Sequence, residues 1–145
     1  MKKLWLILGL VIGLSFVLDF QTTTFAQGDK IRKSLNASVS QRLGADTDIT
    51  ITYCRPGVKG RTIWGELVPY GLTPGNKYSK NKPFPWRAGA NENTTLETTA
   101  DLMVDGQKVP AGKYSIHMIP SEKDWVVILN EKNEEWGSYS YDKSL

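Results

Sequence analysis

The sequence has very few of the residues from which catalytic and metal sites are most often built. It contains one cysteine, Cys54, and one histidine, His117. A single cysteine excludes a disulfide within the chain, so a folded domain has to rely on core burial for its stability. A single histidine excludes every metal site with several histidines and leaves only mixed histidine–carboxylate sites. We therefore expect neither a metal nor a cofactor.

The sequence also lacks a strong excess of charge of one sign. It has 18 basic and 15 acidic residues, and 16 basic and 14 acidic residues remain beyond residue 26. This balance gives no electrostatic footprint for nucleic acid, so we expect no nucleic-acid partner. The Gly-x-x-x-x-Gly-Lys-Ser/Thr spacing of a phosphate-binding P-loop is absent as well.

An uncharged apolar run marks the N-terminus. Lys2 and Lys3 precede residues 4–18, which carry no charge, in the order typical of a signal peptide. We predict a signal-peptide helix over residues 1–26, with cleavage after Ala26 and release to the periplasm or the cell exterior. The alternative is an uncleaved membrane anchor formed by residues 4–18, but that run is shorter than the roughly 20 residues of a spanning helix.

The remaining residues are enough for one domain with one core. We assign residues 27–36 to a flexible N-terminal segment and residues 37–145 to a β domain. Ile49, Ile51 and Tyr53 alternate with threonine or aspartate neighbours, which is the period-two pattern of a half-buried strand. Residues 37–43 alternate more weakly, and the turn-prone residues 44–46 predict that the two segments pair as a hairpin.

The second half of the chain repeats this pattern. Residues 95–104 alternate as one strand, and Asp105-Gly106 predicts a tight hairpin before residues 107–109. Residues 114–118 form the next strand, and the apolar run 125–129 predicts a central strand covered on both faces, with its tryptophan in the core. No window shows a helical stripe. The fold class that we predict is all-β, a single antiparallel sandwich-like or open-barrel domain, with residues 71–85 as a long surface loop.

Two short segments concentrate polar groups suited to ligand binding. Residues 55–61 read RPGVKGR, so Arg55 and Arg61 with backbone amides could surround an anion; the alternative is a solvated turn whose arginines pair with carboxylates elsewhere. Residues 86–92 read WRAGANE, which makes Arg87, Asn91 and Glu92 candidates for orienting a polar ligand. The alternative there is an Arg87–Glu92 pair that anchors an irregular loop.

His117 is the remaining candidate. It lies on the polar side of its strand, where a general base would need a nearby carboxylate such as Glu92. The alternative is a hydrogen-bonded structural histidine. Cys54 ends a strand pattern without a histidine neighbour, which indicates a half-buried strand residue rather than a catalytic thiol.

Several of these segments, taken in order, resemble one family. They are ASVSQ (37–41), YCRPGVKGR (53–61), LVPYG (67–71), WRAGANE (86–92), PAGKYS (110–115) and WG (136–137). They resemble the domain-of-unknown-function family 2911, whose members are exported proteins found largely in Bacteroidota. The resemblance covers the chain beyond the leader and implies no assigned activity, substrate or catalytic residue.

The sequence departs from that family pattern in three ways. Cys54 stands where serine is usual, residues 71–85 are longer than the usual link, and the chain ends where family members continue with strand-forming sequence. We therefore expect a domain truncated at its C-terminus, which would leave a sheet edge uncovered.

We expect a non-catalytic binding or structural module of the cell envelope. Its partner would be a small polar or anionic ligand or an envelope component, and it would meet the membrane only through an uncleaved signal segment. The alternatives are a hydrolase-like enzyme using Glu92 or His117 with an arginine anion site, and a protein-interaction module working through a strand edge.

Overall fold

The computed structural model describes residues 31–144. Over this range the chain is built from seven strands, and its only helical element is the short 3₁₀ helix η1 (Lys77–Ser79). The all-β prediction is therefore confirmed. Within residues 31–144 no helix has the length and apolar character needed to span a membrane. The predicted signal peptide and the alternative anchor over residues 4–18 lie outside the described residues.

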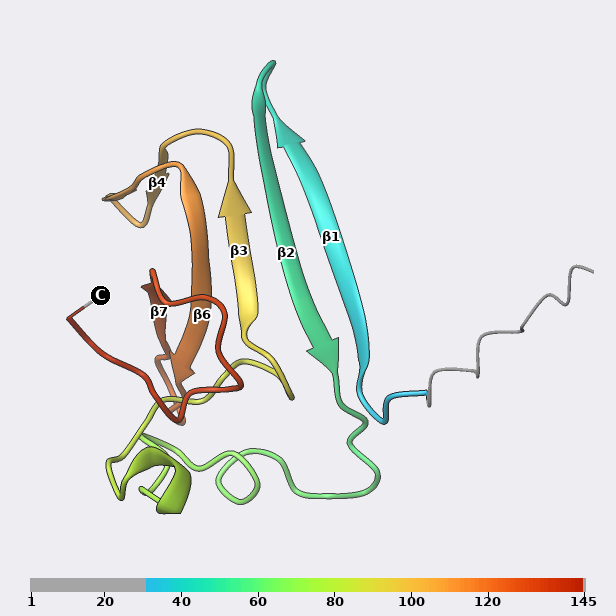
Figure 1. Ribbon diagram of the computed structural model, residues 1–145, viewed down its shortest axis with the longest axis vertical. Helices are drawn as coiled ribbons and strands as arrows, with labels where there is room; N and C mark the ends of the chain where they lie inside the picture. The colour runs from blue at the N-terminus through green and yellow to red at the C-terminus, as the bar shows by residue number, and fades with distance from the viewer. Residues whose placement is uncertain (1–30, 145) are drawn as a thin grey trace, which may run out of the picture. The chain divides into compact units, whose positions relative to one another are not determined.

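Five strands form one antiparallel sheet. The order across it is β1 (Leu35–Leu43), β2 (Thr47–Arg55), β3 (Thr94–Thr98), β6 (Gly112–Ile119) and β7 (Val126–Asn130). A two-stranded hairpin, β4 (Leu102–Val104) and β5 (Gln107–Val109), connects β3 to β6. Figure 1 shows β1 at one edge and the β4 hairpin beyond the end of β3. The sheet is not closed into a barrel, so β1 and β7 are its edges.

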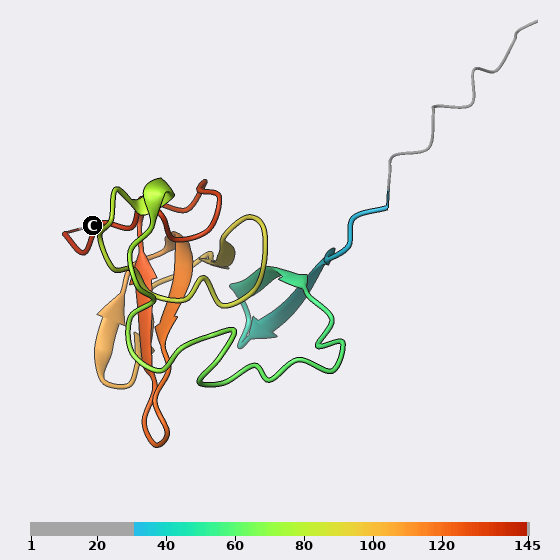
Figure 2. The ribbon, with the colours of Figure 1, turned by 90° about the horizontal axis from the view of Figure 1, so that it is seen from below.

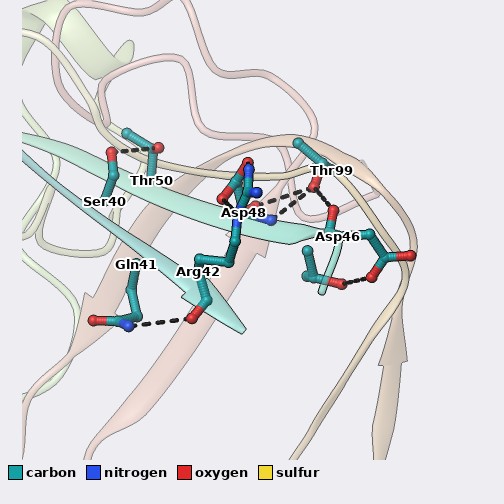
Figure 3. Close-up of polar contacts among 8 residues, drawn as sticks. Ser40, Gln41, Arg42, Asp46, Asp48, Thr50 and Thr99 are labelled. Carbon is teal, nitrogen blue, oxygen red and sulfur yellow. Dashed lines mark hydrogen bonds and ion pairs between the residues drawn. The ribbon is translucent and has the colours of Figure 1, made fainter. Parts of the chain in front are cut away.

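The first predicted hairpin is confirmed. Strand β1 pairs with β2 from Leu35 opposite Arg55 to Leu43 opposite Thr47, and Gly44 adopts a φ of +63° in the connecting turn. The Arg42 guanidinium donates to the Asp48 carboxylate at 2.8 Å beside the turn (Figure 3). Local alternation and turn chemistry were sufficient to define this hairpin because both act over a few residues.

The second hairpin is confirmed, but the strand before it is shorter than predicted. Asp105 and Gly106 both have positive φ, as a type I′ turn requires. Residues 95–104 do not form one strand, because β3 ends at Thr98 and β4 begins at Leu102. The Thr98 hydroxyl donates to the Ala100 carbonyl at 2.8 Å, and this side-chain bond replaces the ladder and bends the chain.

The prediction that residues 125–129 form a central, fully covered strand is wrong. Strand β7 pairs only with β6 among the described strands, and Val126 and Val127 are 54% and 59% exposed. Trp125, which we expected in the core, is 39% exposed. A short apolar run specifies a strand but not its position in the sheet, and an edge strand accommodates the same sequence.

The two faces of the sheet differ in chemistry. Cross-strand partners place Ile51, Leu96 and Tyr114 on one face, where an apolar groove of about 580 Å³ runs under the β4–β5 hairpin. The other face carries Ser115 and Asn130, which are opposite one another and fully buried. The view from below in Figure 2 shows the C-terminal segment and the loop around η1 on one side of the strands.

A buried hydrogen-bond network connects this face to the C-terminal segment. We call it the polar core, and it consists of Asn93, Ser115, His117, Asn130 and Ser138. The His117 ring forms hydrogen bonds with the hydroxyls of Ser115 at 2.9 Å and Ser138 at 2.7 Å. Its two asparagines bond the backbone at Gly137 and Asp142. Among the described residues no buried side-chain nitrogen or oxygen lacks a partner, as a polar interior requires.

Candidate functional site

A cleft lies where β2 ends, among the loops that connect β2 to β3. Figure 1 shows these loops gathered beyond the arrowhead of β2. The cleft has a volume of about 910 Å³, within the range of small-molecule sites. Its lining residues come from the segment before β1, from Cys54 in β2, from parts of the segments 56–68 and 84–91, and from Thr73, Asn76 and Tyr139.

Four cations and no carboxylate line the cleft. The cations are Lys33, Lys59, Arg61 and Arg87. None of them forms an ion pair within the described part of the chain, where the ion pairs join Arg32–Glu92, Arg42–Asp48, Lys108–Asp101 and Lys132–Glu135. Four uncompensated positive charges around one concave surface raise the local concentration of anions.

The RPGVKGR segment supplies two of these cations. Lys59 and Gly60 both have positive φ, which turns the chain sharply. The Arg61 guanidinium donates to the carbonyls of Val58 at 3.0 Å and Gly57 at 2.6 Å, so this side chain is fixed by its own loop. Residues 55–61 are all exposed, as the solvated-turn alternative predicts, but their arginines form no ion pair with a carboxylate among the described residues, contrary to the rest of that alternative.

Arg87 is held in the cleft by its own loop and by a ring from the C-terminal segment. Its guanidinium donates to the Asn91 carbonyl at 2.9 Å, which closes the loop of residues 87–91, and lies 5.0 Å from the centre of the Tyr139 ring. Ala88 and Asn91 have positive φ in this loop, and Thr94 donates to the Ala88 carbonyl at 3.0 Å. A half-buried guanidinium held this way is preorganised for a planar anion such as a carboxylate or phosphate.

Gly137 makes room for that guanidinium, which leads to a prediction. A Cβ at position 137 would lie 2.4 Å from Cζ of Arg87, and the glycine has a φ of +78°. Gly137→Ala is therefore expected to lower the free energy of unfolding by about 1–2 kcal/mol through backbone strain and to displace Arg87. Urea unfolding measures the first effect, and a crystal structure of the variant measures the second. Gly106→Ala is the control, because Gly106 also has a positive φ, +74°, but has open space around the added methyl. If Arg87 were not displaced in Gly137→Ala, the close packing of the Arg87 guanidinium on Gly137 would be refuted.

Aromatic rings form one wall of the cleft. Trp64 is 42% exposed, and its ring lies 5.4 Å from Trp86 and 4.7 Å from Trp125 in edge-to-face geometry. Trp86 exchanges two backbone hydrogen bonds with Met118, both 2.8 Å, which fixes this wall to strand β6. The cleft therefore offers apolar surface beside its cations, and both are suited to an organic anion.

Glu92 lies next to the cleft but not in its lining. Its carboxylate accepts from Arg32 at 2.6 Å and from the thiol of Cys54 at 3.5 Å. The hydrogen bond from Arg32 is the main cause that lowers the pKa of Glu92 below its usual value. The structural alternative of an Arg87–Glu92 pair is wrong, because each of the two side chains has a different partner.

Cys54 is buried in β2, with only 4% of its surface exposed. Its thiol has a carboxylate partner and no histidine contact among the described residues. A buried thiol that donates to a carboxylate and has no histidine neighbour matches the prediction of a structural strand residue.

His117 lies away from the cleft, in the polar core. It is 2% exposed, bonded to Ser115 and Ser138, and packed edge-to-face on Tyr141. Burial lowers its pKa to about 4, so the ring is neutral at pH 7. A buried, neutral ring with both nitrogens bonded matches the structural alternative. No hydrogen bond joins it to Glu92 within the described range.

The structure thus brings together three of the six candidates. Arg61, Arg87 and Asn91 line the cleft, whereas Glu92, His117 and Arg55 do not. Arg55 is exposed at the end of β2. No group of three His, Cys, Asp or Glu side chains within residues 31–144 is arranged to hold a metal.

Two cleft cations were not among the candidates. Lys59 lies in the RPGVKGR segment. The cations and glycines that this segment combines were a signal from which Lys59 could have been predicted as an anion-binding residue. Lys33 precedes β1 in a segment that we expected to be flexible, and no local pattern connects it to residues 56–91.

The described residues thus form an all-β protein with an open antiparallel sheet and a cationic cleft with aromatic walls at the end of β2. Residues 34–145 match the family described as "Protein of unknown function (DUF2911)", and the chain belongs to this family. The family resemblance seen in the sequence is thereby confirmed. Searches of curated proteins and of solved structures gave no match.

Proposed function

We propose that this protein is an exported, non-catalytic binding module of the cell envelope, and that its cleft holds a small organic anion. One observation carries the proposal: four cations and no carboxylate surround a cleft of about 910 Å³. Two of the cations, Arg61 and Arg87, are held in place by backbone carbonyls, so little side-chain entropy is lost when an anion binds.

The position of the remaining polar groups favours binding over catalysis. A general acid or base has to lie within hydrogen-bond reach of the reacting group. Glu92 is paired with Arg32, and His117 is enclosed in the polar core. The cleft itself is lined by cations, amides, hydroxyls and rings, which bind and orient a ligand.

A thermal-unfolding titration tests the proposal with inorganic phosphate, sulfate and a uronic acid as probes. A ligand that binds only the folded state stabilises it by about 2.7 kcal/mol at 100 times its Kd. We expect an anion to raise the Tm of the unaltered protein and the double variant Lys59→Gln, Arg61→Gln to bind it at least tenfold more weakly, since a hydrogen bond to a charged group contributes about 1.5–3 kcal/mol.

The matched control is Lys123→Gln, which removes an exposed cation outside the cleft. It is expected to leave the anion response unchanged. If the anion-induced rise in Tm were reduced equally in the cleft variant and in Lys123→Gln, the anions would be acting through general screening, and the proposal would fail.

A further inference from the structure

Strand β1 leaves its outer edge open. It pairs with β2 along all nine residues, and within residues 31–144 it forms no backbone–backbone hydrogen bond with another segment; the Gln41 side-chain amide donates to the Arg42 carbonyl at 3.2 Å. Figure 1 shows no other labelled strand beyond it. Eight of its nine residues are exposed, with Leu35 at 48%, Val39 at 55% and Leu43 at 46%. A straight edge of this kind is a template for another strand.

The usual protections of an edge strand are missing from β1. It contains no proline, no lysine and no bulge, since its register with β2 is continuous. Its only charged side chain, Arg42, is already paired with Asp48 (Figure 3). No charge on this edge is therefore free to repel an approaching strand.

The sequence of β1 is partly symmetric about its centre: five of its nine positions carry the same residue when it is read in either direction. It runs LNASVSQRL, with Val39 at its centre. In an antiparallel pairing of two copies about Val39, Leu35 would face Leu43 and Ser38 would face Ser40. On the apolar face the central pair would be Val39 with Val39, and the outer pairs leucine with leucine. Such self-complementarity is what a two-fold symmetric interface requires.

We propose that two copies of this protein pair through β1, antiparallel and centred on Val39, to form a continuous ten-stranded sheet. A second copy is the occupant because pairing about Val39 brings valine against valine and leucine against leucine on the apolar face, with only the Ala37–Gln41 pairs unlike. The proposal does not depend on the cleft, which lies among other residues.

Disulfide trapping tests both the pairing and its register in the purified protein with Cys54→Ser. Val39→Cys places two cysteines opposite one another across the two-fold axis, at the Cα separation of about 4.5–5.5 Å that a disulfide accepts. We expect Val39→Cys to form a covalent dimer under mild oxidation. Leu43→Cys alone should stay monomeric on a denaturing gel, because the two cysteines of the dimer would lie roughly 27 Å apart. A mixture of Leu43→Cys and Leu35→Cys should cross-link, because these two positions face one another in the proposed pairing.

Charge variants test the same interface without covalent bonds. Analytical ultracentrifugation should show a dimer for the unaltered protein, a monomer for Val39→Lys and for Val39→Glu, and a dimer again when the two variants are mixed. Val127→Lys on the opposite edge is the control and should remain dimeric. A monomeric unaltered protein, a dimer that persists in Val39→Lys, or efficient trapping by Leu43→Cys alone would each overturn the proposal. Circular dichroism of each variant establishes that its sheet is intact.

Discussion

Lowering the pH from 7 to 4.5 is expected to reduce the free energy of unfolding by about 2 kcal/mol through His117 alone. Burial depresses the pKa of this ring from 6.5 to about 4 in the folded protein. Between these two values the unfolded chain binds a proton that the folded protein does not, so stability falls as the pH decreases through this window. Urea unfolding at half-unit steps of pH measures the effect.

The carboxylates act in a separate, lower window. Hydrogen bonds lower the pKa of Asp48, Glu92 and Asp101 below their ordinary values of 3.8 to 4.5. Their contribution to the free energy of unfolding is present when the pH is above those values and is lost as the pH falls further. The change between pH 6.5 and 5 therefore reports on His117. The variant His117→Gln should be less stable at pH 7 but show a flat profile over that range; an unchanged slope in this variant would contradict the assignment.

Asn130→Ala is expected to lower the free energy of unfolding by about 2–4 kcal/mol. The side chain is 1% exposed and donates to the Asp142 carbonyl at 2.7 Å, while its oxygen accepts from the Lys132 amide at 3.0 Å. Truncation removes both bonds, opens a cavity, and releases the C-terminal segment from the sheet. Thermal and urea unfolding measure the loss.

The control for this prediction is Glu134→Ala, an exposed position in the same segment. It should change stability by less than about 0.5 kcal/mol. Hydrogen exchange adds a spatial readout, because amides of residues 131–144 should exchange faster in Asn130→Ala than in the unaltered protein. If the two variants were equally stable, the polar core would not be what holds the C-terminal segment in place.

The parts of the fold that the sequence predicted are those set by local chemistry. Alternation at Ile49, Ile51 and Tyr53 identified β2, and the turn residues Asp105 and Gly106 identified the β4–β5 hairpin. Both features act within a few residues, so they can be recognised without knowledge of the rest of the chain. The same reasoning could not place β7, because edge and central strands share the same apolar composition.

The candidate site was predictable only in part, because it is assembled from distant segments. The motifs containing Arg61 and Arg87 were recognisable, but their grouping with Lys33 depends on the tertiary fold. The pairing of Glu92 with Arg32, 60 residues away, likewise has no local signature. The polar core was missed for the same reason, since serine and asparagine are usually exposed and only the packed structure shows that they are buried.

The most direct test of the binding proposal is a titration of ¹⁵N-labelled protein with the anion that raises the Tm most, followed by amide chemical shifts. We expect saturable shifts concentrated at residues 57–61 and 87–91, and their loss in the variant Lys59→Gln, Arg61→Gln. Shifts that never saturate, or that spread evenly over lysines and arginines outside the cleft, would contradict it.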